Sequence, residues 1–200
     1  MANNTIDISF ASGRKILPFV EELAALRIEI FREFPYLYQG DTHYEKTYLH
    51  VYTQSPSSLL VLARHNGALV GASTCLPMED EDVAFQRPFL ERNMDLKKIF
   101  YFGESILKKE HRGKGLGHVF FEEREKHAKE LIPELDLTVF CSVIRPDYHP
   151  SKPSDYRPHD AFWNKRGYQK QEGMICSFPW RDIGDTMESH KNLQFWSKFW

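Results

Sequence analysis

Helix and strand patterns alternate along the chain, and the spacing of apolar residues predicts where each lies. Lys15–Phe34 carries eight apolar residues at the three- and four-residue intervals of one helix face. Asp41 is typical of a helix cap and predicts a second helix that ends near Tyr52. Further helices are predicted over Phe85–Asn93, Gly117–Leu131 and Asp160–Arg166.

Short runs of alternating, β-branched or aromatic residues predict the strands. Two of these runs flank Asn66-Gly67, a dipeptide typical of a tight hairpin, and an acidic loop follows over Met78–Val83. The predicted order of elements is β, α, α, β, β, α, β, α, β, α, β, β, which indicates a mixed α/β fold. The predicted strands are Thr5–Ala11, Ser58–Arg64, Ala68–Leu76, Lys98–Lys108, Leu135–Val143, Gly173–Phe178 and Leu193–Trp200.

Length and composition indicate one folded unit. The chain has 200 residues, 42% of them hydrophobic, which predicts a single domain over residues 1–200. A net charge of −2 gives no general attraction to nucleic acid or to an anionic membrane. No apolar run reaches 18 residues and the first residues form no signal peptide, so we expect a cytoplasmic protein. Cys75, Cys141 and Cys176 are widely spaced, and each is predicted to pack as a small apolar residue within a strand.

A Gly-rich turn joins the strand predicted over Lys98–Lys108 to the helix that follows it. The turn reads Arg112-Gly113-Lys114-Gly115-Leu116-Gly117. Its glycines let the main chain approach a ligand without obstruction from side chains. The free N–H groups of the following helix's first turn, together with Arg112 and Lys114, favour an anion at this point. The turn therefore predicts a binding site for a pyrophosphate group.

Three Gly-rich phosphate-binding patterns have to be distinguished. A Walker A loop would end in Lys-Ser or Lys-Thr, and residues 117–119 do not supply that ending. A dinucleotide fingerprint would need a further glycine where Phe120 stands. In the third pattern, Arg or Gln is followed by two residues and then by Gly-x-Gly. Arg112, Gly115 and Gly117 match it, and the match resembles the acetyl-CoA-binding motif of the GCN5-related N-acetyltransferase (GNAT) family.

A second segment, residues 161–168 (AFWNKRGY), resembles the family's late helix, which usually ends in glycine followed by an aromatic residue. The resemblance covers nearly the whole chain, with its specific motifs confined to residues 101–168. It implies a GNAT-like, mostly antiparallel sheet of about six or seven strands flanked by helices. It also implies acetyl-CoA as cofactor, with its pantetheine arm in a gap where strands four and five splay apart, and an amine as acceptor. These two strands would be Phe100–Lys108 and Leu135–Val143.

The resemblance also assigns cofactor-binding roles to individual positions. The pyrophosphate would lie on the turn and on the first residues of the helix, mostly through backbone N–H groups. Main-chain groups near Ser105 and Leu107 would bond the pantetheine amides and the thioester carbonyl. The turn and helix positions are Arg112, Gly113, Lys114, Gly115, Leu116, Gly117 and His118.

Acyl transfer to an amine requires an unprotonated amine and a proton for the leaving thiolate. Glu104 is the candidate base, because burial in an apolar strand would raise the pKa of its carboxyl. Alternatively Glu104 pairs with an arginine or only binds the substrate, and in many GNAT proteins a chain of water molecules carries the proton. The family's acid, a tyrosine of the late helix, corresponds here to Trp163, which can only donate a hydrogen bond and is expected to contact the substrate. Tyr156, where the family often has asparagine, is the candidate acid.

Several tyrosines lie near the expected acceptor site. By the geometry of the family, Tyr36 and Tyr38, in the turn between the first two helices, are expected to contact the substrate. The four-residue spacing of three further tyrosines favours a core stripe with hydroxyls at its rim, formed by Tyr44, Tyr48 and Tyr52.

Two other segments carry expectations. The proline-rich loop over residues 145–159 is expected to be a lid or a specificity element. Its His149 and His159 do not have the spacing of a zinc site, so we expect them to be packed or solvated and predict no metal. The aromatic end of the chain, Phe195–Trp200, is expected to lie in the core or at a contact between two copies of the chain.

Two alternatives to acetyl transfer stay open. The tryptophan in place of the family's tyrosine suggests a CoA-binding regulatory module without transfer activity. The same fold would also serve a transferase that uses a longer acyl-CoA. The sequence does not identify the acceptor amine, because acceptors differ in the shape of the pocket rather than in motif.

Overall fold

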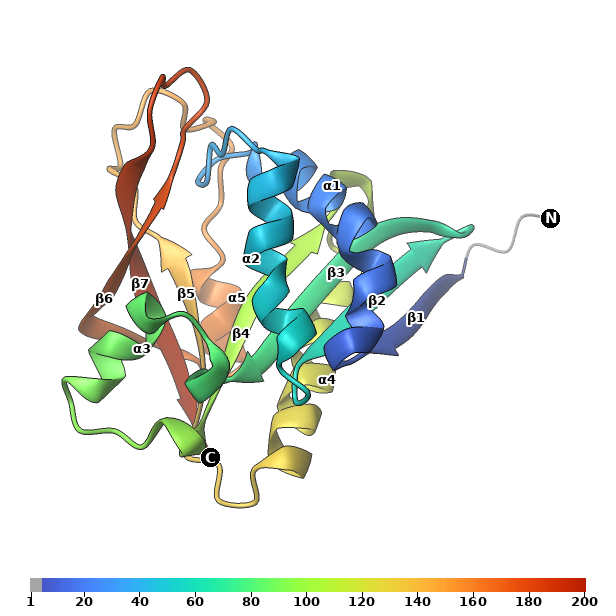
Figure 1. The fold of residues 1–200 in the computed structure, drawn as a ribbon. Helices are drawn as coiled ribbons and strands as arrows, with labels where there is room; N and C mark the ends of the chain where they lie inside the picture. Colours follow the sequence, from blue (N-terminus) through green and yellow to red (C-terminus); the bar gives the residue numbers. More distant parts are fainter. Residues whose placement is uncertain (1–4) are drawn as a thin grey trace.

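The computed structural model describes residues 5–200, which form a seven-stranded sheet with helices on both faces (Figure 1). The strand order is β1-β2-β3-β4-β5-β7-β6, and only β4 and β5 run parallel. The strands are β1 (Ile6–Ala11), β2 (Leu59–His65), β3 (Ala68–Pro77), β4 (Ile99–Leu107), β5 (Leu137–Val143), β6 (Gln169–Trp180) and β7 (Ser189–Phe199). The α-helices are α1 (Val20–Phe31), α2 (Thr42–Gln54), α3 (Val83–Leu90), α4 (Leu116–Leu131) and α5 (Asp160–Lys165).

The fold predicted from the sequence is confirmed, including the gap between the fourth and fifth strands. β4 and β5 pair at only three positions, from Ile99 opposite Leu137 to Tyr101 opposite Val139. Beyond Tyr101 the two strands run apart toward the top of Figure 1. β5 stays paired with β7 as far as Val143, and β4 stays paired with β3 as far as Leu107, so only the two strand edges that face the gap are unpaired.

The first predicted helix, Lys15–Phe34, is wrong at its beginning. A 3-10 helix occupies Gly13–Phe19, and the α-helix begins only at Val20 and ends at Phe31. Pro18 lies inside the 3-10 segment, where its ring and its missing N–H disfavour a regular α-helix. The cap predicted at Asp41 is confirmed, since its carboxylate accepts a hydrogen bond from the N–H of Tyr44.

The last two strands are longer than predicted, because each begins four residues earlier. β6 starts at Gln169 and β7 at Ser189, in stretches too polar to show a strand pattern. β6 is an edge strand, so its polar side chains can face solvent while its backbone pairs with β7. A strand pattern based on apolar residues does not detect such a segment.

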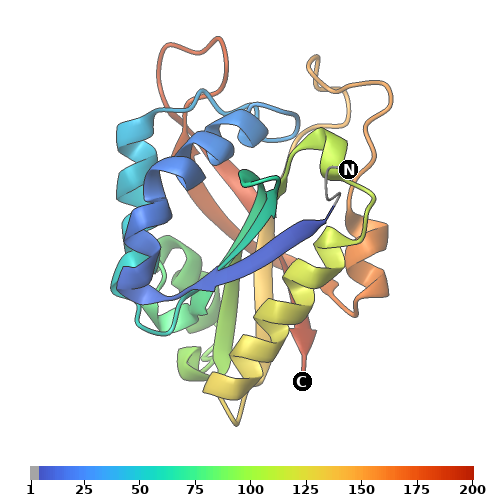
Figure 2. The ribbon, with the colours of Figure 1, turned by 90° about the vertical axis from the view of Figure 1, so that its right-hand side faces the viewer.

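The sheet separates two helical layers, α1 and α2 on one face and α4 and α5 on the other (Figure 2). The alternation of β2 shows the division, because Leu60 and Leu62 pack toward the first layer and Val61 and Ala63 toward the second. None of the helices within residues 5–200 has both the length and the apolar character needed to span a bilayer.

The aromatic end of the chain lies partly in the core. Because β7 runs between β5 and β6, Phe195 and Trp196 are buried. Phe199 and Trp200, by contrast, are 67% and 40% exposed. The ammonium groups of Lys129 and Lys198 lie over the Trp200 ring, at 3.4 and 4.0 Å from its centre. The expectation of a buried segment therefore holds for its first half.

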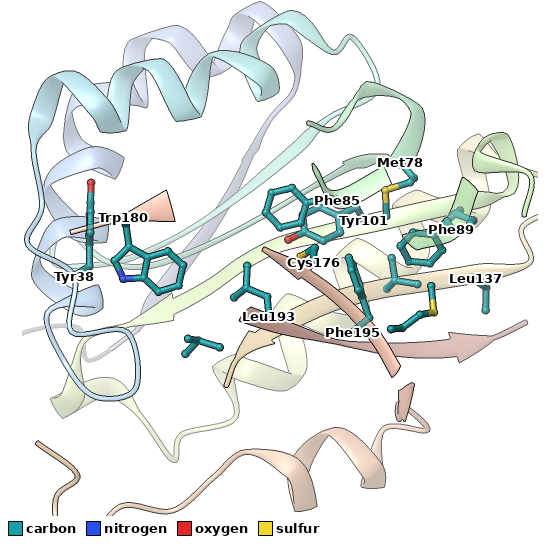
Figure 3. Packing of buried hydrophobic residues seen from close by; sticks show 14 residues of the cluster. Tyr38, Met78, Phe85, Phe89, Tyr101, Leu137, Cys176, Trp180, Leu193 and Phe195 are labelled. Carbon is teal, nitrogen blue, oxygen red and sulfur yellow. The ribbon is translucent and has the colours of Figure 1, made fainter. Parts of the chain in front are cut away.

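A third apolar cluster fills the space between α3 and strands β5, β6 and β7 (Figure 3). Phe89 packs edge-on against Phe195 in the middle of this cluster. The cluster continues along β4 through Tyr101 and ends with Tyr38 beside Trp180. At that end the packing opens into a pocket, which is part of the candidate site.

Candidate active site

The site begins with an irregularity in β4. Ser73 of β3 lies opposite Ser105 of β4, and Cys75 of β3 lies opposite Phe102 of β4. The two pairs are therefore two residues apart along β3 but three residues apart along β4. β4 thus has one extra residue, at Gly103 and Glu104, as in a β-bulge. The bulge depends on glycine, because a Cβ at Gly103 would lie 1.9 Å from the Tyr52 hydroxyl. Its effect is to point the Glu104 side chain toward α1 and α2.

Glu104 meets a buried arginine on that face. One terminal nitrogen of Arg27, on α1, donates to Glu104 Oε2, and its Nε donates to Oε2 of Glu45, on α2. All three side chains are at most 7% exposed. The guanidinium also lies over the rings of Tyr48 and Phe31, at 4.1 and 4.9 Å from their centres. The pKa of the Glu104 carboxyl is raised by burial, and Arg27 opposes this shift.

This ion-pair triad forms one wall of a pocket that we name the aromatic pocket. The empty space that its walls enclose, open mouth included, is about 590 Å³. Nine of its fifteen lining residues are aromatic. Those from the turn after α1 and from α2 are Tyr36, Tyr38, Tyr44 and Tyr48, and the others include Phe85, Phe178 and Trp180.

The aromatic pocket reaches the gap between β4 and β5. Tyr101, Gly103 and Glu104 of β4 and Cys141 of β5 all line it, and the last paired residue of β4 is Tyr101. The Tyr101 hydroxyl lies 3.2 Å from the Cys141 sulfur, across the point where the strands part. A ligand in the gap would therefore meet a ligand in the pocket.

The Gly-rich turn has the geometry of an anion site. Gly113 and Gly115 have φ angles of +72° and +86°, which only glycine adopts readily, and a Cβ at either would meet no atom within 4 Å. Gly115 precedes α4, whose first internal bonds run from His118 and Val119 to the Gly115 carbonyl. Within residues 5–200 the N–H groups of residues 113–117 have no acceptor, so they are free for a ligand.

Arg112 connects the Gly-rich turn to the turn after α1 and to β4. Its guanidinium makes two bonds to the Glu33 carboxylate, of 2.8 and 3.0 Å, and its Nε donates to the Leu107 carbonyl at 2.9 Å. Arg112 is partly exposed at the surface, where a phosphate can reach the same guanidinium.

A second buried arginine holds the bulge from the other face of the sheet. Arg124, on α4, is 1% exposed and donates to the carbonyls of Thr74 and Glu104 and to the Ser105 hydroxyl, at 3.3, 3.2 and 2.7 Å. No carboxylate within residues 5–200 pairs with it, and burial lowers its pKa. Its charge is stabilised by these carbonyls and by the rings of Phe102 and Phe121.

Comparison with known proteins decides which family this arrangement represents. A family profile described as "Acetyltransferase (GNAT) family" matches residues 23–152, more than half of the chain. The chain belongs to the acetyltransferase (GNAT) family. No curated protein sequence matches this GNAT protein at a significant level.

Solved structures of GNAT proteins show the same fold over nearly the whole chain. A ribosomal-protein-alanine N-acetyltransferase from Brucella melitensis is 16% identical, with a TM-score of 0.58 over 97% of this chain and 99% of its own. YncA, a putative acetyltransferase from Salmonella typhimurium solved with acetyl-CoA, is 12% identical, with a TM-score of 0.58 over 98% and 94%. PaiA N-acetyltransferase from Thermoplasma acidophilum, in complex with coenzyme A, is 13% identical, with a TM-score of 0.53 over 98% and 99%.

This GNAT protein brings together some of the predicted acceptor residues and keeps others apart. Tyr36, Tyr38 and Glu104 all line the aromatic pocket. Trp163 instead packs on the opposite face of the sheet, edge-on against Phe140 and Trp196. Trp163 does not line the aromatic pocket, so its contact with the substrate stays a prediction.

Tyr156 is anchored in the proline-rich loop. Its ring packs edge-on against Phe34, with centres 4.7 Å apart, and burial raises the pKa of its phenol. His149 lies against the same Phe34 ring, and His159 against Trp163. The expectation that both histidines are packed or solvated agrees with these contacts.

The predicted core stripe of tyrosines is divided between the core and the pocket. Tyr52 is fully buried, whereas Tyr44 and Tyr48 line the aromatic pocket. The three cysteines lie in strands and are free, as predicted, although Cys141 is only half-buried and faces the pocket.

Two residues of the site, Arg27 and Glu45, were not predicted from the sequence. Each is charged but falls on the apolar face of its helix, Arg27 four residues after Leu23 and Glu45 four residues before Leu49. Opposite charges in phase with the buried faces of two consecutive helices are the signal that could have identified the pair.

Proposed function

We propose that this GNAT protein is an acetyl-CoA-dependent N-acetyltransferase whose acceptor is a primary amine bound in the aromatic pocket. The observation that carries the proposal is the position of the gap between β4 and β5. It lies between the free N–H groups before α4 and the pocket that contains Glu104. A ligand in the gap can thus be held at one end and meet an acceptor at the other.

The residues present fit a CoA group. The N–H groups of residues 113–117, the positive end of α4 and the charges of Arg112 and Lys114 would hold the pyrophosphate. On the side facing β5, the backbone of β4 beyond Tyr101 has no strand beside it, so its polar groups are free to bond the pantetheine amides. Main-chain groups near Ser105 belong to this stretch, while the Leu107 carbonyl already accepts from Arg112.

When bound, acetyl-CoA supplies the acetyl group as a thioester: the amine nitrogen forms a C–N bond, the C–S bond breaks, the amine loses one proton and the thiolate gains one. Glu104 is the proposed acceptor of the amine's proton, directly or through water. Its raised pKa makes its carboxylate a stronger base than usual. Its second oxygen, Oε1, has no partner within residues 5–200 and is available for this purpose. Tyr156 is the proposed proton donor to the thiolate, because its phenol carries a proton at neutral pH. Burial, which raises the pKa of this phenol, makes it a weaker acid than a free tyrosine.

Titration with CoA by calorimetry tests the cofactor site. We expect Arg112→Ala to weaken binding by roughly 10- to 100-fold, the range for the loss of a charged bond to phosphate. Glu33→Gln is the matched control, because it breaks the same ion pair but leaves the Arg112 charge in place. Equal weakening in both variants would show that Arg112 only ties the turn to Glu33. Absence of CoA binding in the unmodified protein would refute the proposal.

Release of free thiol with a panel of amines tests the transfer itself. We expect Glu104→Gln to lower kcat by roughly 100-fold or more while leaving the Kd for CoA unchanged, since the Glu104 side chain faces away from the Gly-rich turn. Tight CoA binding without transfer to any amine would instead favour the regulatory module.

A further inference from the structure

The aromatic pocket contains buried oxygen atoms that lack donors. Glu45 and Glu104 each use one carboxylate oxygen to bind Arg27. The second oxygens, Glu45 Oε1 and Glu104 Oε1, are buried and have no hydrogen-bond partner within residues 5–200, and neither does the hydroxyl of Tyr38. A buried carboxylate oxygen without a donor is costly, so these atoms indicate a ligand that donates hydrogen bonds.

The charge of the triad indicates the sign of that ligand. One guanidinium faces two carboxylates, which leaves one negative charge in excess. Among the described residues that line the aromatic pocket, Arg27 carries the only positive charge. Its two faces are covered by Phe31 and Tyr48, and two of its nitrogens are already bound. A cationic amine therefore fits the triad, whereas an anionic group would meet two carboxylates and no free cation.

The rest of the wall is apolar and aromatic. Phe85, Phe178 and Trp180 also line the pocket, and the Trp180 N–H is already bound to the Tyr36 carbonyl. The Tyr44 hydroxyl is likewise bound, to the Pro179 carbonyl. This wall offers ring faces and edges to a hydrocarbon or aromatic group but no partner for a second charge.

Building on the proposed transfer function, we infer that the acceptor is a small monoamine with an aromatic or hydrocarbon body and no carboxylate group. Its amino group lies on Glu45 and Glu104, and its body packs among Phe85, Phe178 and Trp180. This class excludes free amino acids, because their carboxylate would lie beside the triad. It also disfavours diamines, because their second ammonium would be buried in the apolar wall.

A matched series of amines tests the inference by binding as well as by turnover. Calorimetry with and without CoA compares 2-phenylethylamine, phenylalaninamide, phenylalanine, hexylamine and 1,6-diaminohexane. Phenylalaninamide controls for the bulk of the added group without its charge. We expect phenylalanine to bind roughly 100-fold more weakly than 2-phenylethylamine, and phenylalaninamide to stay within roughly tenfold. We expect diaminohexane to bind at least about tenfold more weakly than hexylamine.

The outcomes separate this inference from the proposed function. If phenylalanine binds within about tenfold of 2-phenylethylamine, or if no amine of the series binds, the acceptor class is wrong even when CoA binds and another amine, such as a peptide's, is acetylated. If the amines bind in the expected order but CoA does not bind, the pocket inference survives and the transferase function fails.

A pair of variants locates the selectivity on the triad. Glu45→Gln keeps the shape of the side chain but removes the excess negative charge, so it should reduce the preference for 2-phenylethylamine over phenylalanine by roughly tenfold. Glu21→Gln is the control, because it breaks an exposed ion pair between α1 and α2 outside the pocket, with Lys46. Selectivity that is unchanged in Glu45→Gln, with circular dichroism like that of the unmodified protein, would overturn the assignment of the amine to this carboxylate.

Discussion

Glu81 is a buried carboxyl group that makes the stability of the protein depend on pH. It lies between β3 and α3 and is 6% exposed. Its Oε1 accepts from the N–H of Asp82 at 3.0 Å, and its Oε2 has no partner within residues 5–200. Burial raises the pKa of this carboxyl from 4.5 to about 8. At neutral pH the folded protein therefore keeps a proton that the unfolded chain releases.

The sign and size of the effect follow from this difference in proton binding. Because the folded state binds more protons than the unfolded state between pH 4.5 and about 8, the free energy of unfolding falls as pH rises through this window. The slope approaches about 1.4 kcal/mol per pH unit while only the unfolded carboxyl is ionised. It flattens near pH 8, where the folded carboxyl ionises too. Between pH 6 and pH 8 the expected loss is about 2 kcal/mol.

Urea unfolding of Glu81→Gln and of the unmodified protein at pH 6, 7 and 8 isolates the contribution of the Glu81 carboxyl to the free energy of unfolding. Glutamine keeps the acceptor for the Asp82 N–H but does not ionise, and the other titrating groups cancel in the difference. We expect the free energy of unfolding of the variant, relative to the unmodified protein, to rise by about 2 kcal/mol from pH 6 to pH 8. Glu79→Gln, at an exposed position in the same acidic loop, is the matched control. A flat or falling difference for Glu81→Gln would refute the reasoning.

Two further predictions concern the bulge and the Gly-rich turn. Arg124→Met should lower the free energy of unfolding in urea by about 3 kcal/mol, because the buried carbonyls of Thr74 and Glu104 lose their donor. Gly115→Ala and Gly173→Ala should each cost about 1 kcal/mol, because both glycines have positive φ and open space around them. Only Gly115→Ala should also weaken CoA binding in calorimetry, and equal CoA affinity in the two variants would contradict its role in the anion site.

The sequence predicts the order of elements well because the fold is built largely from regular periodicity. α4, predicted over Gly117–Leu131, is observed over Leu116–Leu131, and the hairpin around Asn66-Gly67 connects β2 to β3. The errors lie where backbone pairing or chain geometry decides the structure rather than side-chain pattern. The polar first residues of β6 pair with β7 without an apolar signal, and Pro18 changes the type of helix.

The sequence predicts the Gly-rich turn of the site but only part of the aromatic pocket. The Gly-rich turn is contiguous in sequence, so its composition alone indicates a close approach of the main chain to an anion. The aromatic pocket is assembled from α1, α2, α3 and four strands, and its walls combine residues up to 166 positions apart, from Arg27 to Leu193. The residues around Glu45 show only that a charge falls on a buried helix face, and its partner Arg27 lies on another helix.

The proposed base depends on the direction in which the Glu104 side chain points. The regular alternation of side chains along a strand predicts the wrong face of the sheet for it. From Tyr101 onward, a regular strand would turn Glu104 to the same face as Phe102, toward α4 and the rings that surround Arg124. The extra residue in β4 turns it to the α1–α2 face, where Arg27 binds it.

The bulge is held from both sides of the sheet at once. On one face Gly103 leaves room for the Tyr52 hydroxyl, and on the other Arg124 donates to the Glu104 carbonyl. The same residue thus has its carbonyl fixed by α4 and its carboxylate fixed by α1. Because α4 also begins at the Gly-rich turn, one helix connects the predicted CoA site to the position of the proposed base. A shift of α4 on binding would therefore reach Glu104 through a single hydrogen bond to its carbonyl.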